Sequence, residues 1–104
     1  MVVDFDAVRN EVKQYADDVR RVFPVDKVLI YGSYAKGNAD KYSDVNVCFF
    51  IKNYNGKTRI DISSELFKLC EKYKAYIEPR VFKSSEIYRD NPFVNEILKT
   101  GYKI

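Results

Sequence analysis

Two short apolar runs constrain the fold of this chain more than any other feature. Residues 27–31 are rich in β-forming side chains and stop abruptly at Gly32 and Ser33, as a buried strand that feeds a tight turn does. Residues 44–51 are apolar on both faces except at the first and third positions. This second run therefore predicts a central strand that carries two polar side chains, Asp44 and Asn46, at one end.

Amphipathic patterns surround the two runs. From Asp4 to Phe23, apolar residues recur at steps of three and four, with Asp4 or Asp6 available as a cap and Pro24 as a stop, which predicts a helix. Residues 53–57 have the composition of a turn. A second helix is predicted after this turn from an inward stripe formed by Ile62, Leu66, Leu69, Cys70 and Tyr73.

The last third of the chain adds a strand and a helix. A strand is predicted over residues 75–82, and because Pro79 cannot donate to a ladder, it favours an edge strand or a bulge. Asn91 and Pro92 predict the start of a short helix through Lys99, which Gly101 can close. The order of elements predicts an α/β class with a small mixed sheet and about three helices. A chain of 104 residues has room for one core, so we expect a single domain over residues 1–104.

The composition excludes several classes of function. Histidine is absent, which removes serine triads, cysteine–histidine dyads and histidine-ligated zinc. No apolar run approaches the roughly 20 residues needed to cross a bilayer, and the N-terminal residues resemble no signal peptide. We therefore expect a cytoplasmic protein with no membrane partner. The net charge of +3 permits a polyanionic partner without arguing for one.

The polar segment between the two strands has the chemistry of a phosphate and cation site. A glycine after a strand lets the backbone approach a phosphate closely, so Gly32 and Ser33 are predicted to bind the phosphates of a nucleotide. Lys36 can reach the same phosphates, although a solvated loop lysine explains it equally well. Residues two apart in a strand point the same way, so Asp44 and Asn46 place two oxygen ligands on one face, as Mg²⁺ prefers.

Residues 32–46 resemble the signature of the DNA polymerase β-like nucleotidyltransferases. In that signature a strand ends in Gly-Ser, ten residues follow, and Asp-x-Asp opens the next strand; the spacing from Ser33 to Asp44 fits without adjustment. The resemblance implies a polymerase β-like fold that binds a nucleoside triphosphate, ATP, with Mg²⁺ at Asp44 and Asn46. The family also has a third carboxylate on a later strand, as a metal ligand or as a base, and Glu78 is the candidate. The alternative is that Glu78 pairs with Arg80 on a solvated edge.

One residue departs from the signature. Asn46 stands where the family has its second acid, so the site lacks one negative charge and its affinity for a cation should fall. Three accounts remain open: a degenerate protein that only binds nucleotide, an enzyme that works with Asp44 and Glu78, or a deliberate substitution that traps substrate.

In its size, the chain resembles the minimal nucleotidyltransferases of prokaryotic two-gene modules. In these modules the small protein is the antitoxin of a helical HEPN-type ribonuclease toxin, and family members transfer AMP from ATP to a tyrosine of the toxin. The resemblance implies the same transfer to a protein hydroxyl here, with no DNA template. The alternative is an inactive module that binds nucleotide or toxin and acts by occlusion, and antibiotic nucleotidylation ranks last. Within the signature loop, Tyr34 and Tyr42 could touch an adenine or a partner. An apolar patch on the final helix, through Phe93, Ile97 and Tyr102, could serve partner docking or self-association, and core packing explains these residues equally well.

Overall fold

The fold is built around one mixed sheet. A computed structural model describes residues 4–40 and 43–104, and in these residues four strands pair in the order β3-β2-β1-β4. The strands are β1 (Val25–Tyr31), β2 (Val45–Ile51), β3 (Ile77–Lys83) and β4 (Tyr102–Lys103). β1 runs antiparallel to β2 and β4, whereas β2 and β3 are parallel. The predicted mixed sheet is confirmed, and the strand that begins at Asp44 in the prediction lies between two neighbours, as expected for a central strand.

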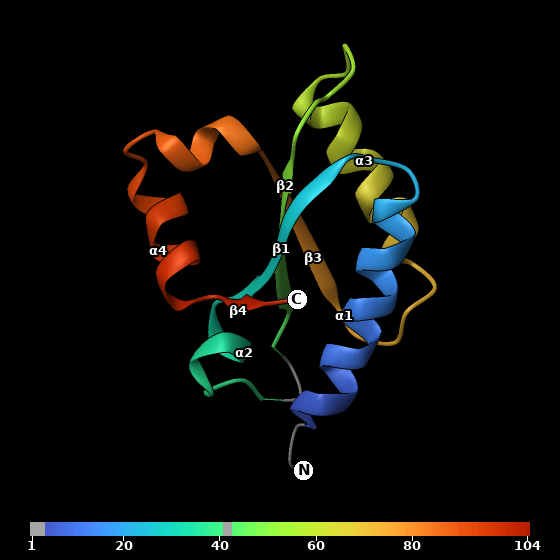
Figure 1. Cartoon of the computed structure of the whole chain (residues 1–104). Coiled ribbons are helices and arrows are strands. Elements are labelled where there is room, and N and C mark those ends of the chain that lie inside the picture. Colours follow the sequence, from blue (N-terminus) through green and yellow to red (C-terminus); the bar gives the residue numbers. More distant parts are fainter. Residues whose placement is uncertain (1–3, 41–42) are drawn as a thin grey trace.

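Helices cover both faces of this sheet. The described helices are α1 (Phe5–Arg20), α2 (Ser33–Lys36), α3 (Arg59–Cys70), α4 (Pro92–Thr100) and the short 3₁₀ helix η1 (Ser84–Tyr88). α1 and α3 lie against one face of the sheet and α4 against the other (Figure 1). The three predicted helices correspond to α1, α3 and α4. The prediction of about three helices missed α2 and η1, because elements of four or five residues are too short to show a periodic pattern.

Local interactions fix the ends of these helices. The Asp4 carboxylate caps α1 by accepting from the Ala7 N–H at 3.2 Å, and the Asn91 side chain accepts from two N–H groups at the start of α4. α3 begins at a capping box formed by Thr58 and Asp61, which was not predicted. Gly101 does close α4, but its φ of −69° is ordinary. Glycine is needed there because a Cβ would lie 2.4 Å from the Ile97 carbonyl oxygen.

The two faces of the sheet bury separate apolar clusters. The larger cluster lies under α1 and α3 and includes Tyr15, Phe49 and Leu66, all fully buried. The smaller cluster lies under α4 and consists of Leu29, Cys48, Phe50, Phe82, Val94 and Ile97. Since successive strand residues face opposite ways, membership of a cluster shows which face each strand residue occupies.

β3 is an edge strand of the sheet, as Pro79 predicts. Its open edge is occupied by side chains of the same chain. The Val81 carbonyl accepts from the Arg59 guanidinium at 2.7 Å, and the Lys83 N–H donates to the Glu86 carboxylate at 3.3 Å. Pro79 has no N–H to offer. These contacts leave little of this edge free to pair with a foreign strand.

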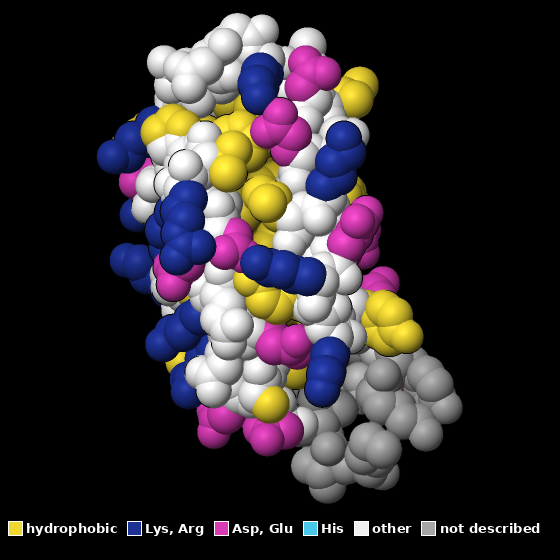
Figure 2. Space-filling model, turned by 90° about the vertical axis from the view of Figure 1, so that its right-hand side faces the viewer, with side chains coloured by type: hydrophobic (Ala, Val, Ile, Leu, Met, Phe, Trp, Pro, Cys, Tyr) yellow, Lys and Arg dark blue, Asp and Glu magenta, His cyan; other side chains and the backbone are white. Residues whose placement is uncertain are grey.

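The face formed by α1 and α3 carries both signs of charge. Figure 2 shows basic and acidic side chains interspersed over this face, with no field of one sign. Several of them form ion pairs, including Asp18 with Arg21 at 3.0 Å and with Lys72 at 2.9 Å. This face is therefore a poor candidate for binding a polyanion. In the described part of the chain, none of the helices could span a bilayer.

Candidate nucleotide site

Gly32 forms the turn at which β1 ends and α2 begins. Its φ of 78° and ψ of −144° lie in a region that side chains other than that of glycine rarely adopt. A Cβ on Gly32 would lie 2.8 Å from the amide nitrogen of Asn46, which is closer than non-bonded atoms allow. The turn therefore needs glycine for its conformation and for the close packing of Asn46 against it. The two residues, fourteen positions apart in the sequence, form one corner.

The register of the sheet brings Asn46 and Glu78 side by side. Asn46 pairs with Tyr31 on β1 and with Glu78 on β3, so the three residues form one row across the sheet. Paired residues of neighbouring strands project from the same face. This face is the α4 side, because Cys48 and Phe82, which follow Asn46 and Glu78 at even spacing, belong to the cluster under α4. The register thus places Glu78 beside Asn46 of the signature strand.

Asp44 and Ser33 lie just beyond this row. Asp44 is exposed and directly precedes β2, and the Val45 N–H donates to the Tyr76 carbonyl at 2.7 Å, so the ladder between β2 and β3 extends to this point. Ser33 is the first residue of α2, and its carbonyl oxygen accepts from the N–H groups of Gly37 and Asn38. Its hydroxyl makes no hydrogen bond with the described residues, so it is available to a ligand.

Lys36 projects from the end of α2 beside a small cavity on the α4 face. The cavity has a volume of about 150 Å³, and its lining includes Tyr31, Gly32, Lys36 and Phe93. Lys36 is exposed and forms no ion pair with the described residues. The sequence left two interpretations of Lys36 open, a phosphate ligand and a solvated lysine. This position is compatible with both.

Glu78 does not pair with Arg80. Across the described residues no ion pair joins them, and the Arg80 guanidinium instead lies 4.9 Å from the centre of the Phe93 ring. Phe93 in turn meets the Tyr31 ring edge-on at 5.9 Å. Burial raises the pKa of Tyr31, and the nearby positive charge of Arg80 opposes that rise. The alternative that Glu78 serves only as the ion-pair partner of Arg80 is therefore not found in this structure.

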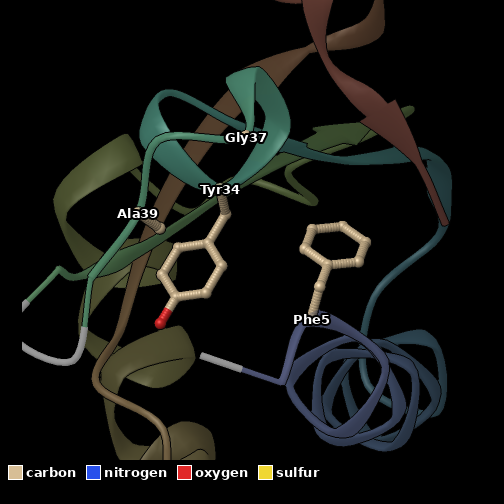
Figure 3. Close-up of a pocket in the computed structure, with 4 residues that line it drawn as sticks. All are labelled: Phe5, Tyr34, Gly37 and Ala39. Atoms are coloured by element: carbon tan, nitrogen blue, oxygen red, sulfur yellow. The ribbon is translucent and has the colours of Figure 1, made fainter. Parts of the chain in front are cut away.

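One tyrosine of the signature loop, Tyr34, is not available for the base contact that the sequence predicted. Tyr34 is buried, with only 7% of its surface exposed, and its ring centre lies 6.4 Å from that of Phe5. Figure 3 shows the Tyr34 ring, which descends from α2, beside the Phe5 ring at the start of α1. Together with Gly37 and Ala39, these two residues line a cavity of about 90 Å³. Tyr34 thus anchors α2 to the core under α1, and the expectation that it touches an adenine is wrong. Tyr42 lies outside the described residues.

The oxygen donors at the corner suit a hard cation that takes only some of its ligands from the protein. Asp44, Asn46 and Glu78 offer two carboxylates and one amide oxygen, and the Asn46 oxygen points away from Gly32 because its nitrogen points toward it. Within residues 4–40 and 43–104, no group of three His, Cys, Asp or Glu side chains could hold a metal. Mg²⁺ commonly takes one or two carboxylates and completes its shell with water and substrate phosphates. The donor set therefore fits Mg²⁺ bound together with a nucleotide; the individual roles of Asp44, Asn46 and Glu78 stay predictions.

Some neighbours of the corner were missed by the sequence reasoning. Arg80 lies two residues after Glu78, so strand alternation alone could have placed it on the same face. Phe93 comes from α4, and no local pattern connects α4 with the signature loop. Tyr31 was read only as the end of a strand, although its pairing with Asn46 puts it in the row of polar residues.

Comparison with known proteins finds relatives of this chain by sequence. The model of the nucleotidyltransferase domain family matches residues 12–100. Two proteins of Methanocaldococcus jannaschii, both named as putative protein adenylyltransferases, are similar in sequence. One is 26% identical over 96 residues, which cover 89% of this chain and 94% of the relative. The other is 29% identical over 110 residues, covering 98% of this chain and 74% of the relative.

Two solved structures share the fold. The crystal structure of a protein from Sulfolobus solfataricus, described as a putative nucleotidyltransferase, has a TM-score of 0.63 at 22% identity, covering 77% of this chain and 70% of that one. A chain from a crystal structure of a toxin–antitoxin with AMP-PNP has a TM-score of 0.55 at 13% identity, covering 90% of this chain and 69% of that one. The polymerase β-like nucleotidyltransferase fold predicted from the signature is thereby confirmed.

Proposed function

Since the chain belongs to the nucleotidyltransferase domain family, we propose that it binds ATP with Mg²⁺ and transfers AMP to a hydroxyl group of a protein. The observation that carries this proposal is the corner at which Gly32, Asn46 and Glu78 meet, with Asp44 at its border. A backbone that a phosphate can approach, next to hard oxygen donors, is the minimum that phosphoryl transfer requires. The names of the two relatives support the choice of a protein as acceptor.

Each residue of the corner has a proposed part. The backbone at Gly32, the free hydroxyl of Ser33 and the ammonium group of Lys36 hold the β- and γ-phosphates. Asp44, Asn46 and Glu78 hold Mg²⁺, which when bound neutralises the phosphate oxygens and the leaving group. The acceptor oxygen bonds to the α-phosphorus, the bond from the α-phosphorus to the bridging oxygen breaks, and pyrophosphate leaves. The Asp44 or Glu78 carboxylate takes the hydroxyl proton.

We further propose that residues 1–104 act as a single nucleotidyltransferase domain in the cytoplasm, beside a partner toxin. The structural neighbour from a toxin–antitoxin with AMP-PNP supports a partner of this class and an adenine nucleotide as substrate. A HEPN-type toxin is the specific partner that the sequence resemblance favours. Its tyrosine hydroxyl is then the acceptor of AMP.

A second function is favoured by Asn46 in particular. An amide in place of a carboxylate removes one full charge from the cation site and lowers its attraction for Mg²⁺. If that loss abolishes transfer, the protein neutralises its partner by covering it, with or without bound nucleotide. Both functions predict a complex with the partner, but only the first predicts a covalent change in it.

Label transfer from ATP distinguishes the two functions. The protein and its candidate partner are incubated with Mg²⁺ and with ATP labelled at either the α- or the γ-phosphate, and the partner is then digested and mapped. AMP transfer predicts label from the α-phosphate alone, attached to a hydroxyl side chain. The Asp44→Asn variant should lose the label, whereas Asp26→Asn, an exposed aspartate at the far end of β1, should keep it. A stable complex without label would favour occlusion. If neither a complex nor a label is found, both functions are refuted.

A further inference from the structure

Arg80 occupies the same face of the sheet as the proposed ligands. It lies two residues after Glu78 on β3 and pairs in register with Cys48, whose side chain is buried under α4. Its guanidinium group rests against the Phe93 ring and lies near Tyr31, the residue that directly precedes Gly32. The cation is thus held next to the row that contains Asn46.

The charge of Arg80 is not neutralised within the described part of the chain. Four other arginines have acidic partners: Arg9 pairs with Asp6, Arg20 with Asp17, Arg21 with Asp18 and Arg59 with Glu86. Among the described residues Arg80 and Arg89 form no ion pair. Arg80 instead lies against the Phe93 ring and shares a side-chain hydrogen bond with Tyr31, and its remaining N–H groups can bind an anion.

The loss of an acid at position 46 changes what this cation can do. The two carboxylates of Asp44 and Glu78 are now matched by the two cations of Lys36 and Arg80, whereas an aspartate at position 46 would leave an excess negative charge. A nearly neutral corner attracts Mg²⁺ less, but it also repels a triphosphate less. A fixed arginine that binds two phosphate oxygens at once can then supply part of the positive charge that a metal ion would bring.

We propose that Arg80 is a phosphate-binding residue of this site, and that with Asn46 it lets the protein hold ATP with less dependence on a divalent cation than an Asp-x-Asp site would show. This inference rests on the proposed nucleotide site. It requires the Arg80 guanidinium to meet the triphosphate directly, while Phe93 holds it in place.

Calorimetric titration of ATP, in excess EDTA and separately in Mg²⁺, tests the inference on four proteins: the unmodified chain, Arg80→Gln, Arg80→Lys and Lys83→Gln. Arg80→Gln removes the charge and with it the cation–π contact to Phe93, but keeps a polar side chain that can form hydrogen bonds. Lys83→Gln is the matched control, because Lys83 is an exposed cation on the same strand that faces away from the site, over the Tyr54 ring. Melting temperatures of all four proteins check that the variants stay folded.

The inference predicts that the unmodified protein and Lys83→Gln bind ATP in EDTA, and that Arg80→Gln binds it at least about tenfold more weakly, the loss expected for one charge-assisted contact. In Mg²⁺ the loss for Arg80→Gln should be smaller, since the metal ion then carries part of the charge. Arg80→Lys should recover only part of the affinity, because an ammonium group cannot bind two oxygens in a fixed fork.

Three results would overturn it in different ways. Equal binding of ATP by Arg80→Gln and the unmodified protein in EDTA would refute the role of Arg80 and leave the proposed function intact. A complete lack of ATP binding in Mg²⁺ by the unmodified protein would refute the nucleotide site itself. Binding that vanishes in EDTA for every variant would show that the site depends on the metal as an ordinary one does, and would also refute the inference.

Discussion

Replacing Gly32 by alanine perturbs the corner on which the account depends. The backbone at Gly32, with φ of 78° and ψ of −144°, is one that alanine adopts only with strain, and such strain costs about 1–3 kcal/mol. The new Cβ would also lie 2.8 Å from the Asn46 amide nitrogen, so this side chain would have to rotate away. In a domain of this size, each 1 kcal/mol lowers the melting temperature by roughly 4–8 °C. We expect a loss of at least several degrees together with weakened nucleotide binding.

The assay compares Gly32→Ala with Gly56→Ala by urea denaturation and by ATP titration. Gly56 also has a positive φ, 81°, and it lies in the turn before α3, away from the site. A Cβ on Gly56 would meet no atom within 4 Å. Both variants should lose stability, and only Gly32→Ala should lose ATP affinity. A Gly32→Ala protein with unchanged stability and unchanged binding would refute the reasoning about the turn.

Two further predictions concern the core under α1 and the acid side of the stability profile. Tyr15→Phe removes the buried hydrogen bond from its hydroxyl to the Leu66 carbonyl, 2.7 Å long, and should cost about 1–2 kcal/mol in urea denaturation; an unchanged midpoint would contradict this. Hydrogen bonds from Tyr73 and Lys72 hold the pKa of Asp18 below its usual value. Their contribution to the free energy of unfolding is therefore fully present above about pH 4, and it is lost as the pH falls through the pKa that Asp18 has in the folded state. Tyr73→Phe should therefore flatten the acid limb of melting temperature against pH, and a superimposable acid limb would rule this out.

The sheet and its main helices could be predicted because their patterns are local. Residues 44–51 are apolar on both faces, which indicates a strand with two neighbours, and Pro79 indicates a strand with one. The Asn91–Pro92 pair marks the start of α4 by itself. By contrast, β4 has only two residues and forms only because Leu29 and Ile30 offer a free edge, which no local pattern reveals.

The candidate site was only partly visible in the sequence. The spacing of Gly32, Ser33 and Asp44 identified the signature, and Glu78 was found from its place on a later strand. The structure shows that this strand is parallel to the signature strand and that Glu78 pairs with Asn46. The role assigned to Tyr34 was wrong because an aromatic residue in a polar loop can turn inward, and here it packs near Phe5. The position of Phe93 over Arg80 depends on how α4 returns across the sheet, which is a property of the tertiary fold.

Titration of ATP with Mg²⁺ into three proteins tests the central claim most directly: the unmodified chain, Asp44→Ala and Asn46→Asp. We expect that the unmodified chain binds, that Asp44→Ala loses the part of the affinity that Mg²⁺ contributes and binds more weakly, and that Asn46→Asp binds the metal nucleotide more tightly because it has a full negative charge beside Glu78. Asp44→Ala should keep its melting temperature, since Asp44 is exposed and precedes the strand. If none of the three proteins binds any nucleotide, the corner of Gly32, Asn46 and Glu78 is not a nucleotide site and the account is contradicted.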